Sequence, residues 1–506
     1  MLPSAARESR IPFWAWIALP IMTAAWLRTR GIGGPEPFVD EAGNILSALD
    51  PRVRAVVDPL GQGRPALAHL FFPAGWLPGH ALEVARLMSA GAGLATMVAI
   101  GWTLQRLAGR AASLCGLWLW AVMPFAVFHE RLALQDSFVA ALLAWAAALM
   151  VAGCQGQSKP PAPFLLSAGV LFGVGCLFKI SAAFALPWLG LLFLAVQPGA
   201  TLPRLGRALA LIVLGAVLPL LCLGPDLFQL GRQSAQFGSL PDFGHGYWST
   251  TAQRVPQWCG WYAGYGRWPL ALLWAGALIL AARVRSAPAL ATALGSALSL
   301  AVAALLYNRP FARYLMPDQV PLILFLALAW APALVATGRR RVIATTLFAA
   351  AAGSWGFASW QISADTRRAD IPADEIGQYF LGPWSGRGLH DVQRYLDDYA
   401  TRHDVRCLVL THRFMRPGCY GLMLAELGDP RIGVVPFTIY EPEELATARA
   451  GLRQVAAGRK VACFLLYEGS LYPAHPWLDQ AAGPAKRVLA VPRGEGDAFT
   501  LYQFEP

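Results

Sequence analysis

Long apolar segments recur along the first 360 residues of this chain, and they restrict its fold more than any other feature. A transmembrane helix needs about 17 to 25 mostly apolar residues. Segments of this character are residues 11–27, 84–104, 111–128, 137–152, 164–178, 182–196, 208–224, 268–282, 288–306, 314–331 and 342–360. Hydrophobic residues form 56% of the 506 residues and charged residues only 14%, which excludes an ordinary soluble protein. The sequence predicts a polytopic α-helical membrane protein with about eleven transmembrane helices.

The basic residues between these segments predict the orientation of the chain. If the N-terminus is cytoplasmic, every inner loop is basic, as the positive-inside rule requires. These loops carry Arg106, Arg110, Lys159, Arg204, Arg207, Arg283, Arg285 and Arg339, Arg340 and Arg341. Arg28 and Arg30, just outside the first helix, are an exception that the later loops outweigh. An odd number of helices then places the C-terminus outside, and the first segment is expected to be a retained helix rather than a cleaved signal peptide.

Two domains are expected, a transmembrane domain at residues 1–362 and an extracytoplasmic α/β domain at residues 363–506. The last part contains helix-like stretches at 389–400, 420–427 and 443–456. They alternate with strand-like stretches at 407–410, between 427 and 443, and at 461–466, and a final strand is expected at 498–504. This alternation predicts a small, mostly parallel sheet. No GxGxxG motif or phosphate-binding loop opens any of these helices, so no nucleotide site is expected there.

Two outer loops of the transmembrane domain are long, residues 28–83 and residues 225–267. The second is rich in aromatic residues, among them Trp258, Trp261 and Tyr265. Two interpretations stay open for this loop. Aromatic rings favour the membrane interface, and they also line loops that close over a sugar or lipid ligand.

The net charge of +11 does not indicate nucleic-acid binding, because the basic residues lie between apolar segments rather than on one soluble face. The eight cysteines include no CxxC pair and no Cys/His spacing typical of a metal site. We therefore expect no metal site and no cofactor, with a divalent cation compatible with the sequence but not signalled by it. The cysteines of the outer side are left unpaired, because sequence alone assigns no disulfide.

Ionisable residues near the helix ends converge on the outer side of the predicted topology. Asp40, Glu41 and Arg64 lie in the first outer loop, Arg131 and Asp136 at the second outer turn, Lys179 between two helices, and Arg313 before the tenth helix. Snorkelling toward the lipid headgroups would explain a single arginine or lysine at such a place. Several cations beside two separate carboxylate sites favour transfer from a phosphate-bearing donor, in which cations hold the phosphate and a carboxylate accepts a proton.

Five short motifs in this order resemble a known family. They are Phe38-Val39-Asp40-Glu41-Ala42, Gly63-Arg64-Pro65-Ala66-Leu67, Arg131-x4-Asp136, Phe178-Lys179 and Arg313-Tyr314-Leu315-x-Pro317. Together they are similar to the bacterial GT-C glycosyltransferases of the protein-mannosyltransferase and aminoarabinose-transferase type, which is glycosyltransferase family 39-like. The similarity covers about 360 residues, and the C-terminal part is similar to the outer domain of bacterial members. Arg64 stands where many members carry lysine, and an arginine fork meets a phosphate differently from a point charge.

The resemblance implies an inverting glycosyltransferase of the bacterial cytoplasmic (inner) membrane, with its C-terminus in the periplasm. Its donor would be a polyprenyl-phosphate sugar, either hexosyl or pentosyl, and its acceptor a lipid, a glycan or a protein. Asp40 would be the base, supported by Glu41, and Asp136 would orient the acceptor. The donor phosphate would be bound by four basic residues, Arg64, Lys179, Arg313 and Arg131.

Two alternatives belong to other classes of protein. A transporter or flippase for a lipid-linked glycan would place charges near the bilayer midplane and repeat its architecture in two halves. The sequence shows no such repeat, and its charges lie at one membrane boundary. A non-catalytic scaffold of an envelope complex is supported only by the C-terminal domain.

Overall fold

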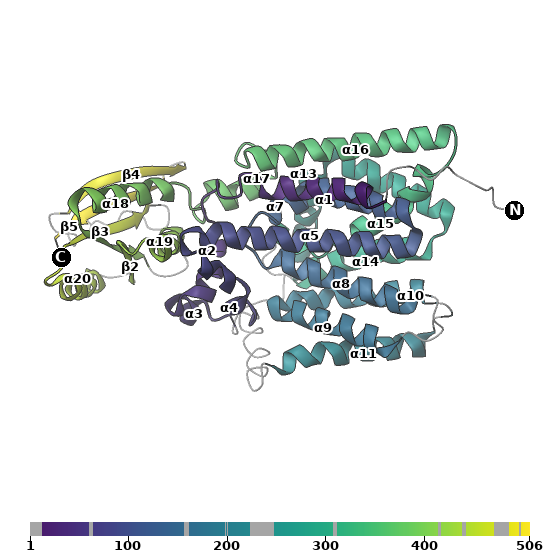
Figure 1. The fold of residues 1–506 in the computed structure, drawn as a ribbon, viewed down its shortest axis with the longest axis horizontal. Helices are drawn as coiled ribbons and strands as arrows, with labels where there is room; N and C mark the ends of the chain where they lie inside the picture. Colours follow the sequence, from purple (N-terminus) through teal and green to yellow (C-terminus); the bar gives the residue numbers. More distant parts are fainter. Residues whose placement is uncertain are drawn as a thin grey trace.

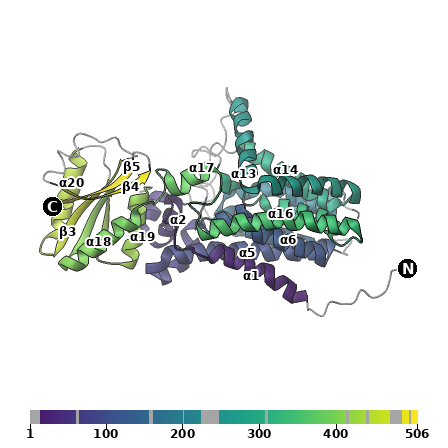
Figure 2. The same cartoon turned by 90° about the horizontal axis from the view of Figure 1, so that it is seen from above.

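A computed structural model describes residues 13–59, 64–155, 161–197, 199, 201–222, 247–306, 311–412, 416–437, 442–469, 485–494 and 497–505. The molecule has a helical part and a smaller part with a β-sheet, which lie end to end along the long axis (Figure 1). The same two parts are seen when the molecule is turned by 90° (Figure 2). The prediction of a helical membrane domain with a C-terminal α/β domain is confirmed.

Each apolar segment predicted from the sequence overlaps a helix. In chain order these are α1 (Phe13–Thr29), α5 (Ala81–Ala108), α6 (Arg110–Val122) with α7 (Pro124–His129), α8 (Asp136–Cys154), α9 (Ala162–Phe178), η3 (Ile180–Ala185) with α10 (Leu186–Val196), α11 (Leu202–Leu221), α13 (Tyr247–Val284), α14 (Ala287–Leu306), η4 (Ala312–Leu315) with α15 (Gln319–Leu334), and α16 (Arg339–Ala364). Most of these helices run roughly along the long axis of the molecule, with α1, α5 and α16 side by side (Figure 1), whereas part of α13 projects across it (Figure 2).

Within the described residues, five helices are long and apolar enough to cross a membrane by themselves. They are Pro78–Ala108, Asp136–Cys154, Leu202–Leu221, Ala252–Val284 and Arg339–Ala364. Five further apolar helices are shorter: Arg110–Val122, Ala162–Phe178, Ile180–Val196, Ala287–Val302 and Gln319–Leu334. The chain is therefore a multi-pass membrane protein, while the number of about eleven spans stays a prediction.

Helices α9 and α11 approach closely because glycines lie at their contact. A Cβ atom on Gly169 would lie 2.2 Å from the carbonyl oxygen of Ile212, and one on Gly173 would lie 2.4 Å from that of Ala216. Any side chain would push the two backbones apart, so small residues permit this packing. The contact fixes the end of α9, which Lys179 follows directly.

The first outer segment is folded into short helices rather than an open loop. These are α2 (Val39–Leu49), α3 (Pro51–Val57), α4 (Leu67–Leu70), η1 (Phe72–Trp76) and η2 (Pro78–His80). Helix α2 is amphipathic and buries Val39, Ala42, Ile45 and Leu46. It lies between the helical bundle and the sheet (Figure 1), so Asp40 in its first turn stands where the two parts meet.

Part of the predicted second outer loop is also helical. Helix α13 begins at Tyr247 and continues to Val284, with a kink at Arg267, where φ is 49° and ψ is −154°. Trp258, Trp261 and Tyr265 are buried on this helix, so these three rings pack within the protein. Residues 225–246 of the predicted loop lie outside the described residues.

The C-terminal part contains a five-stranded sheet with the order β2-β1-β3-β5-β4. Its strands are β1 (Arg406–His412), β2 (Ile432–Phe437), β3 (Val461–Glu468), β4 (Lys486–Gly494) and β5 (Asp497–Phe504). Strands β2, β1 and β3 are parallel, whereas β3, β5 and β4 pair antiparallel. The parallel strands and β5 were predicted from the sequence, whereas β4 was not.

Helices cover both faces of this sheet. Helix α18 (Leu389–His403) buries Leu389, Val392, Leu396 and Ala400, a spacing typical of an amphipathic helix. Helix α19 (Pro417–Gly428) packs beside it, and α20 (Pro442–Ala456) contributes Leu452 to a separate apolar cluster on the other face. The eight cysteines are free thiols in this structure.

The C-terminal part packs directly on the first outer segment. The backbone N–H of Val39 donates to the carbonyl oxygen of Trp384 at 3.2 Å, and Gly43 of α2 faces the ring of Tyr420 on α19. Arg52 forms an ion pair with Glu426 at 3.1 Å. These contacts bring the C-terminal part against the helix that carries Asp40. The domain division at residues 362 and 363 stays a prediction, and α16 itself ends at Ala364.

Candidate active site

Asp40 and Arg313 form the centre of the candidate site. Oδ2 of Asp40 accepts a hydrogen bond from Nη2 of Arg313 at 2.6 Å. The Asp40 side chain is 38% exposed, while that of Arg313 is only 8% exposed. The carboxylate is therefore open to a substrate on one side and held by a buried cation on the other. Because these residues are 273 positions apart, only the fold brings them together.

A second carboxylate and cation lie beside the first pair. Nζ of Lys179 donates to Oδ1 of Asp136 at 2.6 Å. Asp136 begins α8, and Lys179 has the extended backbone that separates α9 from η3. Both side chains are largely buried, and Oδ2 of Asp136 has no hydrogen-bond partner among the described residues. A buried carboxylate oxygen without a partner is available to accept a hydrogen bond from a bound molecule.

Tyr314 connects the two ion pairs. Nζ of Lys179 lies 3.5 Å from the centre of the Tyr314 ring. The guanidinium of Arg313 lies 4.8 Å from the ring centre of Phe311 and 5.9 Å from that of Phe38. Rings in such positions attract cations through their negative faces. The site is thus a row of two carboxylates and two cations along an aromatic wall.

Arg64 adds a third positive charge to this row. Its charge acts on both Lys179 and Tyr314. The backbone N–H of Ala66 donates to the carbonyl oxygen of Leu177 at 3.1 Å, which anchors the Arg64 segment to the end of α9. The structure therefore brings together five of the seven site residues predicted from the sequence. These are Asp40, Arg64, Asp136, Lys179 and Arg313.

Glu41 is buried and points into the protein rather than into the candidate site. Its two oxygens accept hydrogen bonds from Nε and Nη2 of Arg86, each at 2.8 Å. The carboxylate also accepts from the backbone N–H groups of Phe38 at 3.1 Å and Ala133 at 2.8 Å. Glu41 thereby fixes the start of α2, the helix that carries Asp40, and its supporting role for Asp40 stays a prediction. Arg86 was not among the residues predicted from the sequence, because snorkelling toward the headgroups explains a single arginine near the end of an apolar helix equally well.

Arg131 contacts backbone carbonyl groups. Its Nη1 donates to the carbonyl oxygens of Leu27 at 3.0 Å and Arg30 at 2.7 Å, at the end of α1. These bonds satisfy acceptors that a helix end leaves open. Arg131 therefore anchors α1 in this structure, and its assignment as a phosphate ligand stays a prediction. Nearby Arg28 is fully buried and ion-paired with Glu130, which explains a basic residue on the outer side of the first helix.

The segment after α16 supplies further residues that the sequence analysis missed. Here α17 (Ala373–Ile376) and the π-helical turn η5 (Gly377–Leu381) bury Glu375 and Tyr379. The Tyr379 hydroxyl lies 3.4 Å from Nη1 of Arg313, and Oε2 of Glu375 accepts a hydrogen bond from the Tyr265 hydroxyl at 2.9 Å. Burial raises the pKa of Glu375 to about 7 and raises the pKa of Tyr379 well above its ordinary value. No short motif marks these residues in the sequence.

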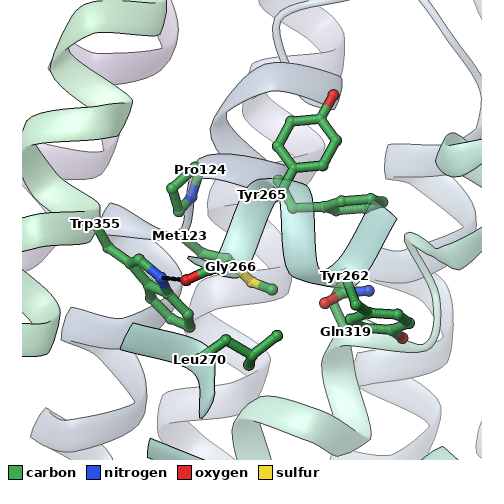
Figure 3. Close-up of a pocket in the computed structure, with 9 residues that line it drawn as sticks. Met123, Pro124, Tyr262, Tyr265, Gly266, Leu270, Gln319 and Trp355 are labelled. Carbon is green, nitrogen blue, oxygen red and sulfur yellow. Dashed lines mark hydrogen bonds between the residues drawn. The ribbon is translucent and has the colours of Figure 1, made fainter. Parts of the chain in front are cut away.

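Two hollows lie near this cluster. The first, with an empty volume of about 230 Å³, is lined by Met123, Pro124, Phe125, Tyr262, Tyr265, Gly266, Leu270, Gln319 and Trp355. In Figure 3 the indole of Trp355 donates to the carbonyl oxygen of Gly266 at 2.9 Å, which closes one side. The second, with an empty volume of about 450 Å³, lies beside Tyr314 and is mostly apolar, with Ser181, Ser299 and Asp318 among its lining residues.

Comparison with known proteins agrees with this architecture. Residues 69–225 match the model of the dolichyl-phosphate-mannose-protein mannosyltransferase family. No curated protein sequence matches the chain. The structure is similar to ArnT from Cupriavidus metallidurans in the apo state, with a TM-score of 0.56 and 13% identity over 97% of each chain.

Two further solved structures share the fold. ArnT from the same organism bound to undecaprenyl phosphate has a TM-score of 0.54 and 13% identity, over 96% of this chain and 98% of that chain. The oligosaccharyltransferase AglB from Archaeoglobus fulgidus, in complex with an inhibitory peptide and a dolichol-phosphate, has a TM-score of 0.52 and 11% identity, over 93% of this chain and 70% of that chain. The predicted resemblance is therefore confirmed: the chain has the GT-C glycosyltransferase fold of ArnT and carries a protein-mannosyltransferase family match at residues 69–225.

Proposed function

We propose that this protein transfers one sugar from a polyprenyl-phosphate carrier to an acceptor at the outer face of a bacterial cytoplasmic membrane. The observation that carries the proposal is the row of Asp40, Arg313, Lys179 and Asp136, in which each carboxylate is paired with a cation at 2.6 Å. Such a row provides a base for an acceptor and positive charge for a phosphate.

Asp40 is the proposed general base, because it is the most exposed carboxylate of the two pairs. In the proposed reaction it takes the proton from the acceptor hydroxyl while that oxygen attacks the anomeric carbon of the sugar. The bond between this carbon and the phosphate oxygen breaks, and the polyprenyl phosphate leaves with the bonding electrons. Attack opposite to the leaving group inverts the anomeric centre. Asp136, through its free Oδ2, would accept a hydrogen bond from the acceptor.

The donor phosphate would lie against Arg64, Lys179 and Arg313. A phosphate leaving group needs little acid catalysis when fixed cations stabilise its charge. These protein cations would supply this stabilisation without a cofactor. Tyr314, whose ring contacts Lys179, also lines a mostly apolar hollow, so the lipid chain of the carrier would leave the phosphate site along this side. The structures of ArnT with undecaprenyl phosphate and of AglB with a dolichol-phosphate support a lipid-phosphate ligand for this fold.

The orientation is part of the proposal. The basic inner loops favour a cytoplasmic N-terminus and a periplasmic C-terminal part. The site residues lie at the end of the helical bundle nearer the C-terminal part, because α2 joins the two (Figure 1). The transferred group would be hexosyl or pentosyl, and the acceptor a lipid, a glycan or a protein.

An assay of sugar release tests the proposed function against transport. Purified protein is incubated with a panel of polyprenyl-phosphate sugars, and free polyprenyl phosphate is measured with and without candidate acceptors. A transferase releases polyprenyl phosphate in step with glycosylated product. Movement of an intact lipid-linked sugar across vesicles reconstituted with the protein, without any release, would instead establish a transporter or flippase.

A further inference from the structure

The connection between the last membrane helix and the C-terminal sheet returns into the wall of the candidate site. Helix α16 ends at Ala364, and the chain then forms α17 and η5 before α18 begins at Leu389. Glu375 is 1% exposed and Tyr379 is 2% exposed, so this connection is buried in the protein. A connection that is buried in this way can hold the side chains that it contacts in fixed positions.

Tyr379 contacts the terminal nitrogen of Arg313 that does not bond to Asp40. Nη2 of the guanidinium donates to Asp40 at 2.6 Å, while Nη1 lies 3.4 Å from the Tyr379 hydroxyl. The Tyr379 ring packs against Phe38, with ring centres 4.6 Å apart, and against Phe128 at 5.5 Å. These rings fix the position of the hydroxyl, so the arginine fork is held at both of its terminal nitrogens.

Glu375 anchors the same connection at a second place, away from Arg313. Its Oε2 accepts from the Tyr265 hydroxyl at 2.9 Å and lies 3.4 Å from Nε2 of His129. Tyr265 belongs to α13 and His129 to α7, so the connection is tied to two different parts of the bundle. Tyr379 thereby has a fixed support rather than the mobility of a surface loop.

We propose that Tyr379 is a positioning residue for the donor site, whose hydroxyl keeps Arg313 in place when its guanidinium exchanges Asp40 for the donor phosphate. This inference rests on the proposed function and extends it to the connection before the C-terminal sheet. In this structure Arg313 is engaged with the proposed base. Binding of a phosphate beside Arg313 draws Nη2 from Asp40 and frees the carboxylate to accept a proton, while Nη1 stays on Tyr379.

The physical reason is the flexibility of arginine. Its long side chain loses rotamer freedom whenever it is fixed in one geometry. A second contact that persists through the exchange reduces this loss at the moment of binding, and preorganisation of this kind increases affinity. A guanidinium offers separate donors on its two terminal nitrogens, so both contacts can exist at once.

Binding of undecaprenyl phosphate to purified full-length protein tests the inference. Tyr379→Phe keeps the ring and removes only the hydroxyl. We expect its Kd for undecaprenyl phosphate to rise about 3- to 10-fold, the range of one modest hydrogen bond. The matched control is Tyr399→Phe, which removes a hydroxyl that accepts from Nε2 of Gln503 at 2.7 Å on the C-terminal sheet. Its Kd should equal that of the wild type.

A double-mutant cycle separates positioning from a general loss of structure. Arg313→Lys removes the fork, so adding Tyr379→Phe to Arg313→Lys should weaken binding no further. Thermal unfolding of each variant is measured alongside, and the cycle is compared among folded proteins. Equal Kd values for Tyr379→Phe and wild type, or effects of the two substitutions that simply add, would overturn the inference.

The same measurements distinguish this inference from the proposed function. If wild type transfers sugar and Tyr379→Phe binds the lipid phosphate normally, the function stands and the positioning role is refuted. If wild type releases no sugar from the donor panel, but its lipid phosphate binding depends on Tyr379 and Arg313 together, the positioning role stands and the transferase proposal fails. Absence of undecaprenyl phosphate binding to wild type refutes both.

Discussion

Replacing Asp40 with asparagine tests the mechanism most directly, because it removes basicity and little else. The amide keeps the shape of the side chain and can still accept from Nη2 of Arg313, now 2.6 Å from Oδ2 of the carboxylate. A positioned general base contributes about a hundred- to ten-thousandfold in rate, which corresponds to roughly 3 to 5 kcal/mol in the barrier. We expect turnover to fall by at least about a hundredfold.

The affinity of Asp40→Asn for the donor should stay near that of the wild type or rise, although turnover falls. In the wild type the Asp40 carboxylate competes with the donor phosphate for Arg313, whose side chain is only 8% exposed. The neutral amide competes less, because a hydrogen bond between a cation and an anion is stronger than one between a cation and a neutral group. Equilibrium binding of undecaprenyl phosphate and single-turnover release from a polyprenyl-phosphate sugar measure the two effects separately. Near-normal sugar transfer by a correctly inserted Asp40→Asn protein would refute the assignment of the base.

Glu41→Gln is the matched control on the neighbouring residue. The Glu41 carboxylate accepts two bonds from Arg86 and one each from the backbone N–H groups of Phe38 and Ala133. Weakening a buried ion pair from one side costs up to about 3 to 5 kcal/mol. We therefore expect a lower unfolding temperature, with less loss of turnover per folded molecule than in Asp40→Asn. A larger loss of turnover in folded Glu41→Gln would move the base to Glu41.

Three further outcomes are expected. Lys179→Ala and Arg313→Ala should each weaken undecaprenyl phosphate binding about ten- to a hundredfold, since each removes a charge-assisted contact; normal binding by both would make these residues interfacial anchors. Burial raises the pKa of Glu375 to about 7 from an ordinary 4.5, so between pH 4.5 and 7 the folded protein binds more protons than the unfolded chain. The free energy of unfolding should therefore fall as the pH rises from about 4.5 to 7. Glu375→Gln should flatten that part of the curve of unfolding temperature against pH, and an unchanged slope would show that Glu375 does not titrate there. A reporter fused after residue 364 should be active only in its periplasmic form, and activity of a cytoplasmic reporter would reverse the topology.

Much of the fold was predictable because it depends on local properties of the chain. A membrane span needs a continuous apolar stretch of a certain length, and such stretches are visible without any knowledge of packing. The alternation of helices and strands in the C-terminal part is equally local, and it predicted the parallel strands β1, β2 and β3 and the terminal strand β5. Strand β4 was not predicted, because its proline and its charged residues weaken the pattern typical of a strand. Its sequence is Lys486-Arg-Val-Leu-Ala-Val-Pro-Arg-Gly494.

The first outer segment shows where local pattern becomes ambiguous. A polar stretch between two apolar segments predicts a loop, but the described residues between 28 and 83 form the short helical elements α2, α3, α4, η1 and η2. Helix α2 buries Val39, Ala42 and Ile45, it contacts both α5 and α19, and its Gly43 leaves room for the ring of Tyr420. These partners lie far away in the sequence, so no window along the chain contains them.

For the candidate site as well, one part was predictable from the sequence and another part was not. The motifs around Asp40, Asp136, Lys179 and Arg313 were found because several cations and carboxylates gather at the outer ends of apolar segments, which snorkelling of single residues does not explain. Their pairing was not visible, because Asp40 and Arg313 are separated by 273 positions and Asp136 and Lys179 by 43.

The sequence by itself determined that the chain crosses the membrane many times, that it ends in an α/β domain, and which charged residues are candidates for chemistry. Only the tertiary structure decided the partner of each charge. It assigned Arg313 to Asp40, Lys179 to Asp136 and Arg86 to Glu41. It also placed Tyr379 beside Arg313, although no sequence motif marks the connection that carries Tyr379. The reason is physical: hydrophobicity acts through the total apolar area of each segment, whereas an ion pair depends on a few ångströms between atoms that only the packed helices bring together.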